Sequence, residues 1–206
     1  MQKMHIYLFL LLTFVTNLAI AQSSASKILV MGDSLSAGYG IDIQQGWVSL
    51  LEKELPQTHQ VKIINASVSG ETSSGGKTRL SPLLEEHKPD VVILELGGND
   101  GLRGQPLKLL ENNLQAMIDA SKSAGAKVIL VGMQIPPNYG PRYSNQFKNL
   151  YPALAEKNQI GLIPFLLEGI GGNVELMQRD GIHPTAEAQT IILKNALPEI
   201  KKYLAD

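Results

Sequence analysis

The 206-residue sequence contains no cysteine, and this absence removes several classes of chemistry. Without thiols the chain has no disulfide framework, no thiolate nucleophile and no cysteine-ligated zinc site. An excess of either charge is also missing, because 18 basic residues face 19 acidic ones and the net charge is −1. A balanced chain creates no strong field for nucleic acid or anionic lipid, so we expect neither as a partner. Stability must come from a hydrophobic core.

Long hydrophobic runs are confined to the N-terminus. Residues 1–21 combine a basic start, an apolar run over residues 6–14 and small residues at Ala19 and Ala21. This order is typical of a secretory signal peptide cleaved after Ala21, whereas a membrane-spanning helix needs about 20 apolar residues. A retained N-terminal anchor is the alternative. Residues 22–206 are predicted to form a single soluble domain, monomeric and without stable membrane insertion after processing.

The rest of the sequence alternates between short apolar runs and longer helical patterns. Four of the five runs are continuously apolar, which is typical of strands buried on both faces of a parallel sheet. This alternation favours an α/β fold: a three-layer α/β/α domain with about five parallel strands in a doubly wound, flavodoxin-like order. The expected strands are residues 28–31, 61–65, 91–96, 128–133 and 162–165, and the expected helices are residues 46–55, 73–86, 106–124, 142–158 and 185–204, the last with Thr185 as its N-cap.

Small and amide-bearing residues follow the first three expected strands. Ser34 lies two residues after Gly32, the segment 65–72 contains two serines and Gly70, and Asn99 is enclosed by glycines. Because the carboxyl ends of parallel strands deliver residues to a shared crevice where ligands bind, we expect these three loops to face one site. The alternative for each loop is an ordinary strand-to-helix turn.

A serine nucleophile also needs a base, and residues 22–206 contain three histidines. His59 lies in a polar connection, and His87 lies at an expected helix C-terminus, where it needs no other role. His183 follows Asp180 by three residues in a non-helical segment. At that spacing a turn can bring the carboxylate to Nδ1 and leave Nε2 to take the serine proton. A structural His–carboxylate contact is one alternative, and a metal site is another, although no third ligand stands out.

Taken together, these segments resemble the SGNH, or GDSL, hydrolase family over nearly the whole of residues 22–206. All four family blocks occur in order: Gly32-Asp33-Ser34-Leu35, the segment 65–72, Gly97-Gly98-Asn99-Asp100, and Asp180-Gly181-Ile182-His183-Pro184. The Gly-x-Ser-x-Gly elbow of the common α/β-hydrolases is absent around Ser34, which disfavours that architecture.

The resemblance implies a serine esterase with no cofactor and no metal. It assigns Ser34 as nucleophile, His183 as base and Asp180 as the residue that orients the base. It also implies an oxyanion hole formed by the backbone N–H groups of Ser34 and Gly70 and by the side-chain amide of Asn99.

Within the family, the stretches 95–104 and 137–140 resemble secreted bacterial enzymes that hydrolyse thioesters, lysophospholipids and aryl esters. This similarity implies a small acyl ester or thioester as substrate, lysophospholipids included, and a periplasmic location with secretion as the alternative. Apolar residues near the expected crevice favour an alkyl chain over a sugar, namely Leu102, Ile135 and Pro136. A carbohydrate acetyl esterase is one alternative function. A non-catalytic flavodoxin-like binding module is another, which the lack of a Walker lysine loop disfavours.

Overall fold

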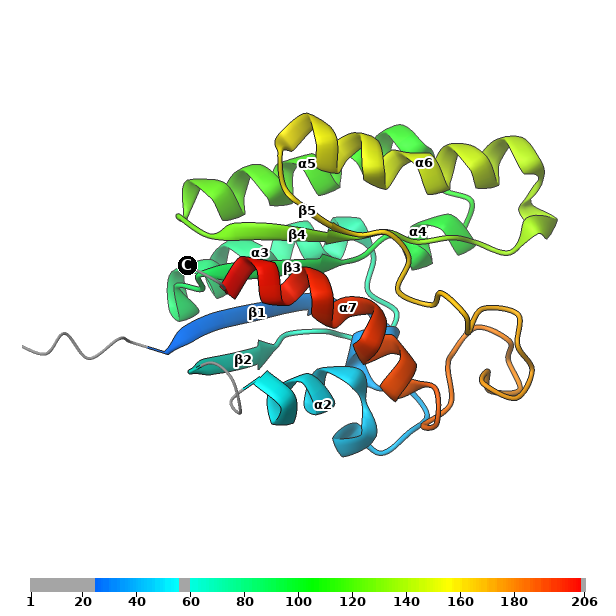
Figure 1. The fold of residues 1–206 in the computed structure, drawn as a ribbon. Helices are drawn as coiled ribbons and strands as arrows, with labels where there is room; N and C mark the ends of the chain where they lie inside the picture. Colours follow the sequence, from blue (N-terminus) through cyan, green and yellow to red (C-terminus); the bar gives the residue numbers. More distant parts are fainter. Residues whose placement is uncertain (1–24, 56–59, 205–206) are drawn as a thin grey trace, which may run out of the picture.

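The computed structural model describes residues 25–55 and 60–204, so the expected signal peptide and His59 lie outside the described residues. A five-stranded parallel sheet runs through the middle of the protein in the order β2-β1-β3-β4-β5 (Figure 1). This order confirms the doubly wound, flavodoxin-like prediction. The strands are β1 (Ser26–Gly32), β2 (Val61–Asn65), β3 (Val91–Glu95), β4 (Lys127–Val131) and β5 (Gly161–Ile163).

Helices cover both faces of the sheet and create the expected three layers (Figure 1). On one face lie α3 (Ser73–His87), α5 (Leu107–Ser123) and α6 (Pro141–Asn158). On the other lie α2 (Trp47–Glu54) and α7 (Gln189–Leu204). Shorter turns of helix join these elements, namely α1 (Ser34–Ala37), α4 (Gly98–Leu102) and the 3-10 turns η1 (Ile43–Gln45) and η3 (Pro137–Tyr139).

The central strand β1 shows why its sequence is apolar throughout. Successive side chains of a strand point to opposite faces. Accordingly Ile28 and Val30 pack with α2 and α7, while Leu29 and Met31 pack with α3 and α5, and all four are fully buried. The edge strand β2 differs, because Lys62 is exposed and the strand is only half covered.

The beginning of the last helix was predicted wrongly. Helix α7 begins at Gln189 and not at Thr185, so Thr185 is not its N-cap. The backbone N–H of Thr185 instead donates to the carbonyl of Leu176 over 2.9 Å, and Met177 pairs with Pro184 in an isolated antiparallel bridge. This pairing keeps the backbone after His183 extended, so it cannot join the helix.

Smaller differences also have local causes. Strand β5 ends at Ile163 because Pro164 has no N–H to donate to a neighbouring strand. The turn after β1 contains the unpredicted helix α1, which Asp33 caps and Gly38 ends in a left-handed conformation. Within the described ranges, we find no helix that is both long enough and apolar enough to cross a membrane.

Candidate active site

Ser34 is the first residue of α1, immediately beyond the carboxyl end of the central strand β1. The turn is tight because Asp33 Oδ1 accepts the N–H of Leu35 over 3.0 Å. Gly32 is required there, since a Cβ at that position would lie 2.5 Å from Glu95 Oε2. Ser34 is 9% exposed, so its hydroxyl lies in a recess and is not on the open surface.

The side chain of His183 connects Ser34 to Asp180. Its Nε2 lies 2.9 Å from Ser34 Oγ, and its Nδ1 lies 2.7 Å from Asp180 Oδ2. Partial burial raises the pKa of Asp180, but hydrogen bonds from the His183 backbone and ring and from the Ile182 N–H outweigh it and lower that pKa to about 2. An ionised Asp180 accepts the Nδ1 proton, so Nε2 faces Ser34 as an acceptor.

Two residues that the sequence reasoning missed hold this histidine. The ring of Tyr39 lies 4.4 Å from the ring of His183, centroid to centroid. Gln178 donates its backbone N–H to the carbonyl of His183 over 2.7 Å, and its Nε2 to the carbonyls of Tyr39 and Pro184. The histidine loop, the orange segment between β5 and α7 in Figure 1, is thereby tied to the loop that follows Ser34.

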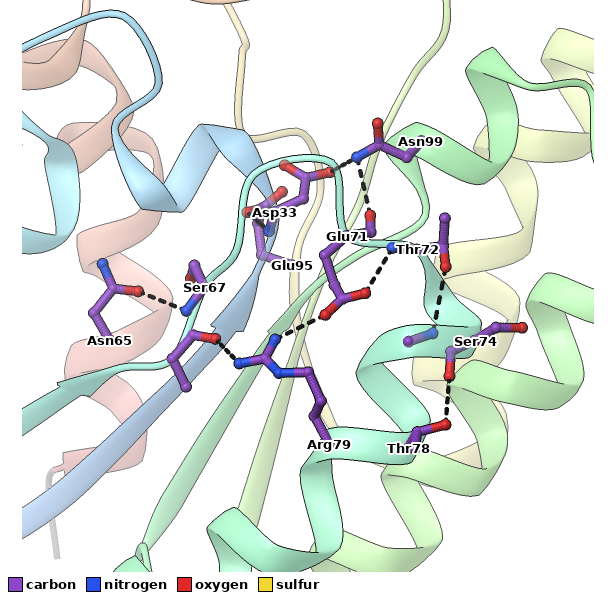
Figure 2. A network of polar contacts seen from close by, with 12 residues as sticks. Asp33, Asn65, Ser67, Glu71, Thr72, Ser74, Thr78, Arg79, Glu95 and Asn99 are labelled. Carbon is purple, nitrogen blue, oxygen red and sulfur yellow. Dashed lines mark hydrogen bonds and ion pairs between the residues drawn. The ribbon is translucent and has the colours of Figure 1, made fainter.

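Asn99 lies near the start of α4, on the segment that follows β3. Its Nδ2 donates to Asp33 Oδ2 over 3.1 Å and to the backbone carbonyl of Glu71 over 2.9 Å (Figure 2). Glu71 follows Gly70, which has a φ of 80° that side chains rarely allow. Asn99 therefore joins the loops that follow β1 and β2, as expected for a shared crevice.

The loop carrying Gly70 is held from below by an arginine of α3. Arg79 forms an ion pair of 2.8 Å with the Glu71 carboxylate and also donates to the carbonyl of Ala66 over 2.7 Å (Figure 2). Glu71 additionally accepts the N–H of Thr72. These contacts fix the backbone on either side of Gly70.

A pair of buried carboxyl groups lies beneath the Ser34 turn, and sequence reasoning missed its importance. Asp33 is 3% exposed and Glu95 is fully buried. Glu95 Oε2 accepts the N–H of Asp33 over 3.1 Å and the hydroxyl of Ser36 over 2.6 Å. Burial raises the pKa of Asp33 to about 6 and, together with the charge of Asp33, raises that of Glu95 well above its ordinary value. The sequence did contain one signal for this pair, because the charged Glu95 ends the otherwise apolar run of β3.

A cavity of about 490 Å³ opens beside Ser34 and His183. Its walls come mainly from the segments after β3, β4 and β5, and they include Leu102, Ile135 and Pro136, the three predicted pocket residues. Asn99 also lines the cavity, whereas Gly70 lies outside the lining residues. Further apolar walls come from residues that were not predicted, namely Met133, Phe165, Leu167 and Met177.

Most of the predicted site residues therefore line one cavity, and the other two, Asp180 and Gly70, are connected to residues that line it. Ser34, Asp180 and His183 form a hydrogen-bonded line, Asn99 is joined to Asp33 next to Ser34, and Gly70 is linked through the adjacent Glu71. Across residues 25–55 and 60–204, no three histidine or carboxylate side chains gather closely enough to hold a metal ion.

Comparison with known proteins places this geometry in context. The GDSL-like Lipase/Acylhydrolase family matches residues 30–191. Esterase TesA of Pseudomonas aeruginosa is 50% identical over 184 residues, covering 89% of this chain and 92% of the relative. Arylesterase of Vibrio mimicus is 47% identical over 91% of this chain and 94% of the relative. Thioesterase 1/protease 1/lysophospholipase L1 of Escherichia coli is 40% identical over 87% of this chain and 85% of the relative.

A solved structure agrees with these sequence matches. The crystal structure of TesA superposes with a TM-score of 0.85 at 49% identity, covering 87% of this chain and all of the other. The family match spans the Ser34 turn, the Asn99 segment and the Asp180–His183 loop. This chain belongs to the GDSL-like lipase/acylhydrolase family.

Proposed function

We propose that this protein hydrolyses carboxylic esters and thioesters through an acyl-enzyme formed on Ser34. The observation that carries the proposal is the continuous line from Ser34 Oγ through His183 to Asp180, which opens into an apolar cavity. The printed names of the relatives, esterase, arylesterase and thioesterase/lysophospholipase, support the same class of substrate.

In the first half of the reaction, Ser34 Oγ attacks the acyl carbonyl while His183 Nε2 takes the hydroxyl proton. Asp180 stabilises the imidazolium that forms. His183 then gives this proton to the departing alkoxide or thiolate, leaving the acyl group on Ser34. In the second half, water attacks the acyl-enzyme, His183 again acts as base, and the carboxylic acid leaves.

The negative oxygen of each tetrahedral intermediate needs donors. We assign this role to the backbone N–H groups of Ser34 and Gly70 and to Asn99 Nδ2. The position of Asn99 in the wall of the same cavity as Ser34 and His183 supports the assignment. Both Asn99 hydrogen bonds described above are to groups within the protein, so the amide must share one hydrogen with the intermediate.

The cavity wall indicates the kind of acyl group. Leu102, Ile135 and Pro136 present apolar surface, which favours an alkyl chain such as that of a lysophospholipid or an acyl thioester. A carbohydrate acetyl esterase would need polar groups for the sugar in the same wall. We therefore place acyl-chain hydrolysis ahead of deacetylation.

The setting in which the enzyme acts follows from the N-terminal sequence. We propose that residues 1–21 direct export and are removed after Ala21, and that the mature monomer works in the periplasm. Mass spectrometry of the exported protein tests this. A mature N-terminus at Gln22 supports cleavage, whereas a membrane-bound product that retains residues 1–21 contradicts it.

The proposed activity is tested with nitrophenyl esters and acyl thioesters whose chains run from two to many carbons. We expect hydrolysis of both series, with Ser34→Ala inactive, and an increase in kcat/KM as the chain grows to fill the cavity. A fluorophosphonate should label Ser34 in the wild type and leave Ser34→Ala unlabelled. Absence of labelling would favour a binding module, and hydrolysis restricted to acetylated sugars would favour the deacetylase.

A further inference from the structure

The orientation of the Asn99 amide is fixed by two acceptors. A primary amide nitrogen carries two hydrogens. Asn99 Nδ2 makes two hydrogen bonds, one to the Glu71 carbonyl and one to Asp33 Oδ2 (Figure 2). The amide plane is thus defined before any substrate arrives. The value of an oxyanion donor depends on such preorganisation, because a donor that must reorient does not stabilise charge as it develops.

Of these two acceptors, Asp33 is the one that also touches the nucleophile turn. Its Oδ1 accepts the Leu35 N–H and its Oδ2 accepts the Asn99 amide, so one carboxylate joins α1 to α4. The group is 3% exposed, so water does not compete strongly for it. Asp33 therefore sets the position of Asn99 relative to the Ser34 turn, and all three residues line the cavity.

The hydrogen bonds also indicate which of the two buried carboxyl groups carries the negative charge. Two carboxylates this close and this buried do not both ionise. Both oxygens of Asp33 accept N–H groups, whereas Glu95 Oε1 has no hydrogen-bond partner within the described part of the chain. A proton on Glu95 leaves Asp33 ionised, and a charged acceptor forms a shorter and stronger hydrogen bond with Asn99.

We propose that Asp33, ionised above a protonated Glu95, is the positioning residue for the oxyanion site and acts by fixing the Asn99 amide in one orientation, from which it shares a hydrogen with the negative oxygen of the intermediate. The proposal rests on the oxyanion role assigned to Asn99 above. Asp33 touches no reacting atom in this scheme. Its contribution is the direction of the Asn99 donor.

Asp33→Asn tests this with nearly unchanged shape. If the new side-chain oxygen caps Leu35, its NH₂ group faces the NH₂ of Asn99, and two donors repel. We expect kcat for a nitrophenyl ester to fall about 10–100-fold while KM stays within about twofold, because only the transition state uses the oriented amide. Asp33→Ser keeps an oxygen for the cap but is too short to reach Asn99, and we expect a similar fall in kcat.

Asp42 provides a matched control elsewhere in the chain. Asp42 Oδ1 accepts the N–H of Gln44 over 2.9 Å, which is the same type of cap, and Asp42 is exposed outside the cavity lining. Asp42→Asn should leave kcat unchanged. Thermal melts of all variants report their stability. A loss of kcat in both Asp33 variants that merely tracks the fall in Tm would overturn the positioning role in favour of a structural one.

A double-mutant cycle separates this proposal from the proposed function. If Asp33 acts through Asn99, Asp33→Asn should cost less than about twofold in kcat once Asn99 is alanine. If the two losses multiply, Asp33 does not act through Asn99, and the positioning role fails while the oxyanion role of Asn99 stands. If Asn99→Ala by itself leaves kcat unchanged, the oxyanion assignment fails, and the positioning role falls with it.

Discussion

Two aspartates serve opposite sides of the same site, and their surroundings give them opposite properties. Asp180 lies on the histidine loop with its side chain 38% exposed, and its pKa is lowered to about 2. Asp33 lies beneath Ser34, is almost fully buried beside Glu95, and its pKa is raised to about 6. One residue type therefore gives a firmly ionised group on one side and a group near its titration point on the other.

The comparison also teaches how each side responds to pH. For Asp180 the folded pKa is below the ordinary value of 3.8, so the stability it contributes is present above that value and is lost as the pH falls toward about 2. For Asp33 the folded pKa is above 3.8, so the folded state loses stability as the pH rises from 3.8 to about 6. The contribution of Asp180 to stability is thus kept until the pH falls below 3.8, whereas burial of Asp33 costs the folded state least at low pH.

The largest expected effect on kcat comes from replacing Ser34 or His183. Ser34→Ala and His183→Ala should each lower kcat by roughly 10⁵–10⁶-fold, and the double variant should lose little more, because the pair acts as a unit. Steady-state rates on an activated ester measure this. Losses that multiply in the double variant would contradict a shared proton transfer.

Asp180→Asn tests the exposed side. The asparagine oxygen can still accept the N–H groups of Ile182 and His183, but its NH₂ group then faces His183 Nδ1 and stabilises the wrong tautomer. We expect kcat to fall about 10³–10⁴-fold while Tm changes little, because this part of the loop is exposed. Rates and melts of the purified variant decide the matter. A near-normal rate would make Asp180 a purely structural partner.

Asn99→Ala tests the buried side and should have a smaller effect. Removing one donor aimed at developing charge should lower kcat by about 10²–10³-fold, with KM nearly unchanged. The contact with the Glu71 carbonyl is also lost, so a modest fall in Tm is expected. If KM and kcat change together in a poorly folded variant, Asn99 serves the loop and not the reaction.

Glu95→Gln should have the smallest effect and tests the state of the buried pair. Glutamine has the shape of the protonated acid and never has to hold a proton. Since the folded pKa of Glu95 is raised, wild-type stability declines as pH rises above the ordinary value of 4.5, and the variant avoids this decline. The Tm of the variant should therefore exceed that of the wild type by a few degrees at pH 9 and equal it near pH 5. A constant difference between the two pH values would show that Glu95 is already ionised.

Much of the fold could be predicted from local sequence. The buried run over β1 identified the central strand, and the change to Gly32-Asp33-Ser34 located the turn that carries the proposed nucleophile, because apolar continuity and small turn residues are local signals. The start of α7 could not be predicted in this way. It depends on pairing between Leu176 and Thr185, and no helix-capping pattern near Thr185 reveals a partner nine residues upstream.

The same distinction between local and long-range contacts applies to the site. The Asp180–His183 contact was predictable because only three residues separate the partners. Asp33 and Glu95 are 62 residues apart, and Asn99 and Asp33 are 66 apart. These contacts form because β1 lies next to β3. A residue pattern predicts such contacts only after the order of the strands in the sheet is known. Residues that act through distant neighbours, such as Gln178 and Tyr39, gave no local signal.

The 149 residues between Ser34 and His183 have a consequence for the newly made chain. At synthesis rates of about 5–20 residues per second, Ser34, the proposed nucleophile, precedes His183, its proposed base, by about 7–30 s. The histidine segment is fixed by the docking of α7, whose Ile192, Ala196 and Ile200 complete the second hydrophobic layer. In the proposed mechanism, hydrolytic activity therefore waits until α7 has been made and has docked. An incomplete chain carries the serine but cannot attack the acyl groups around it.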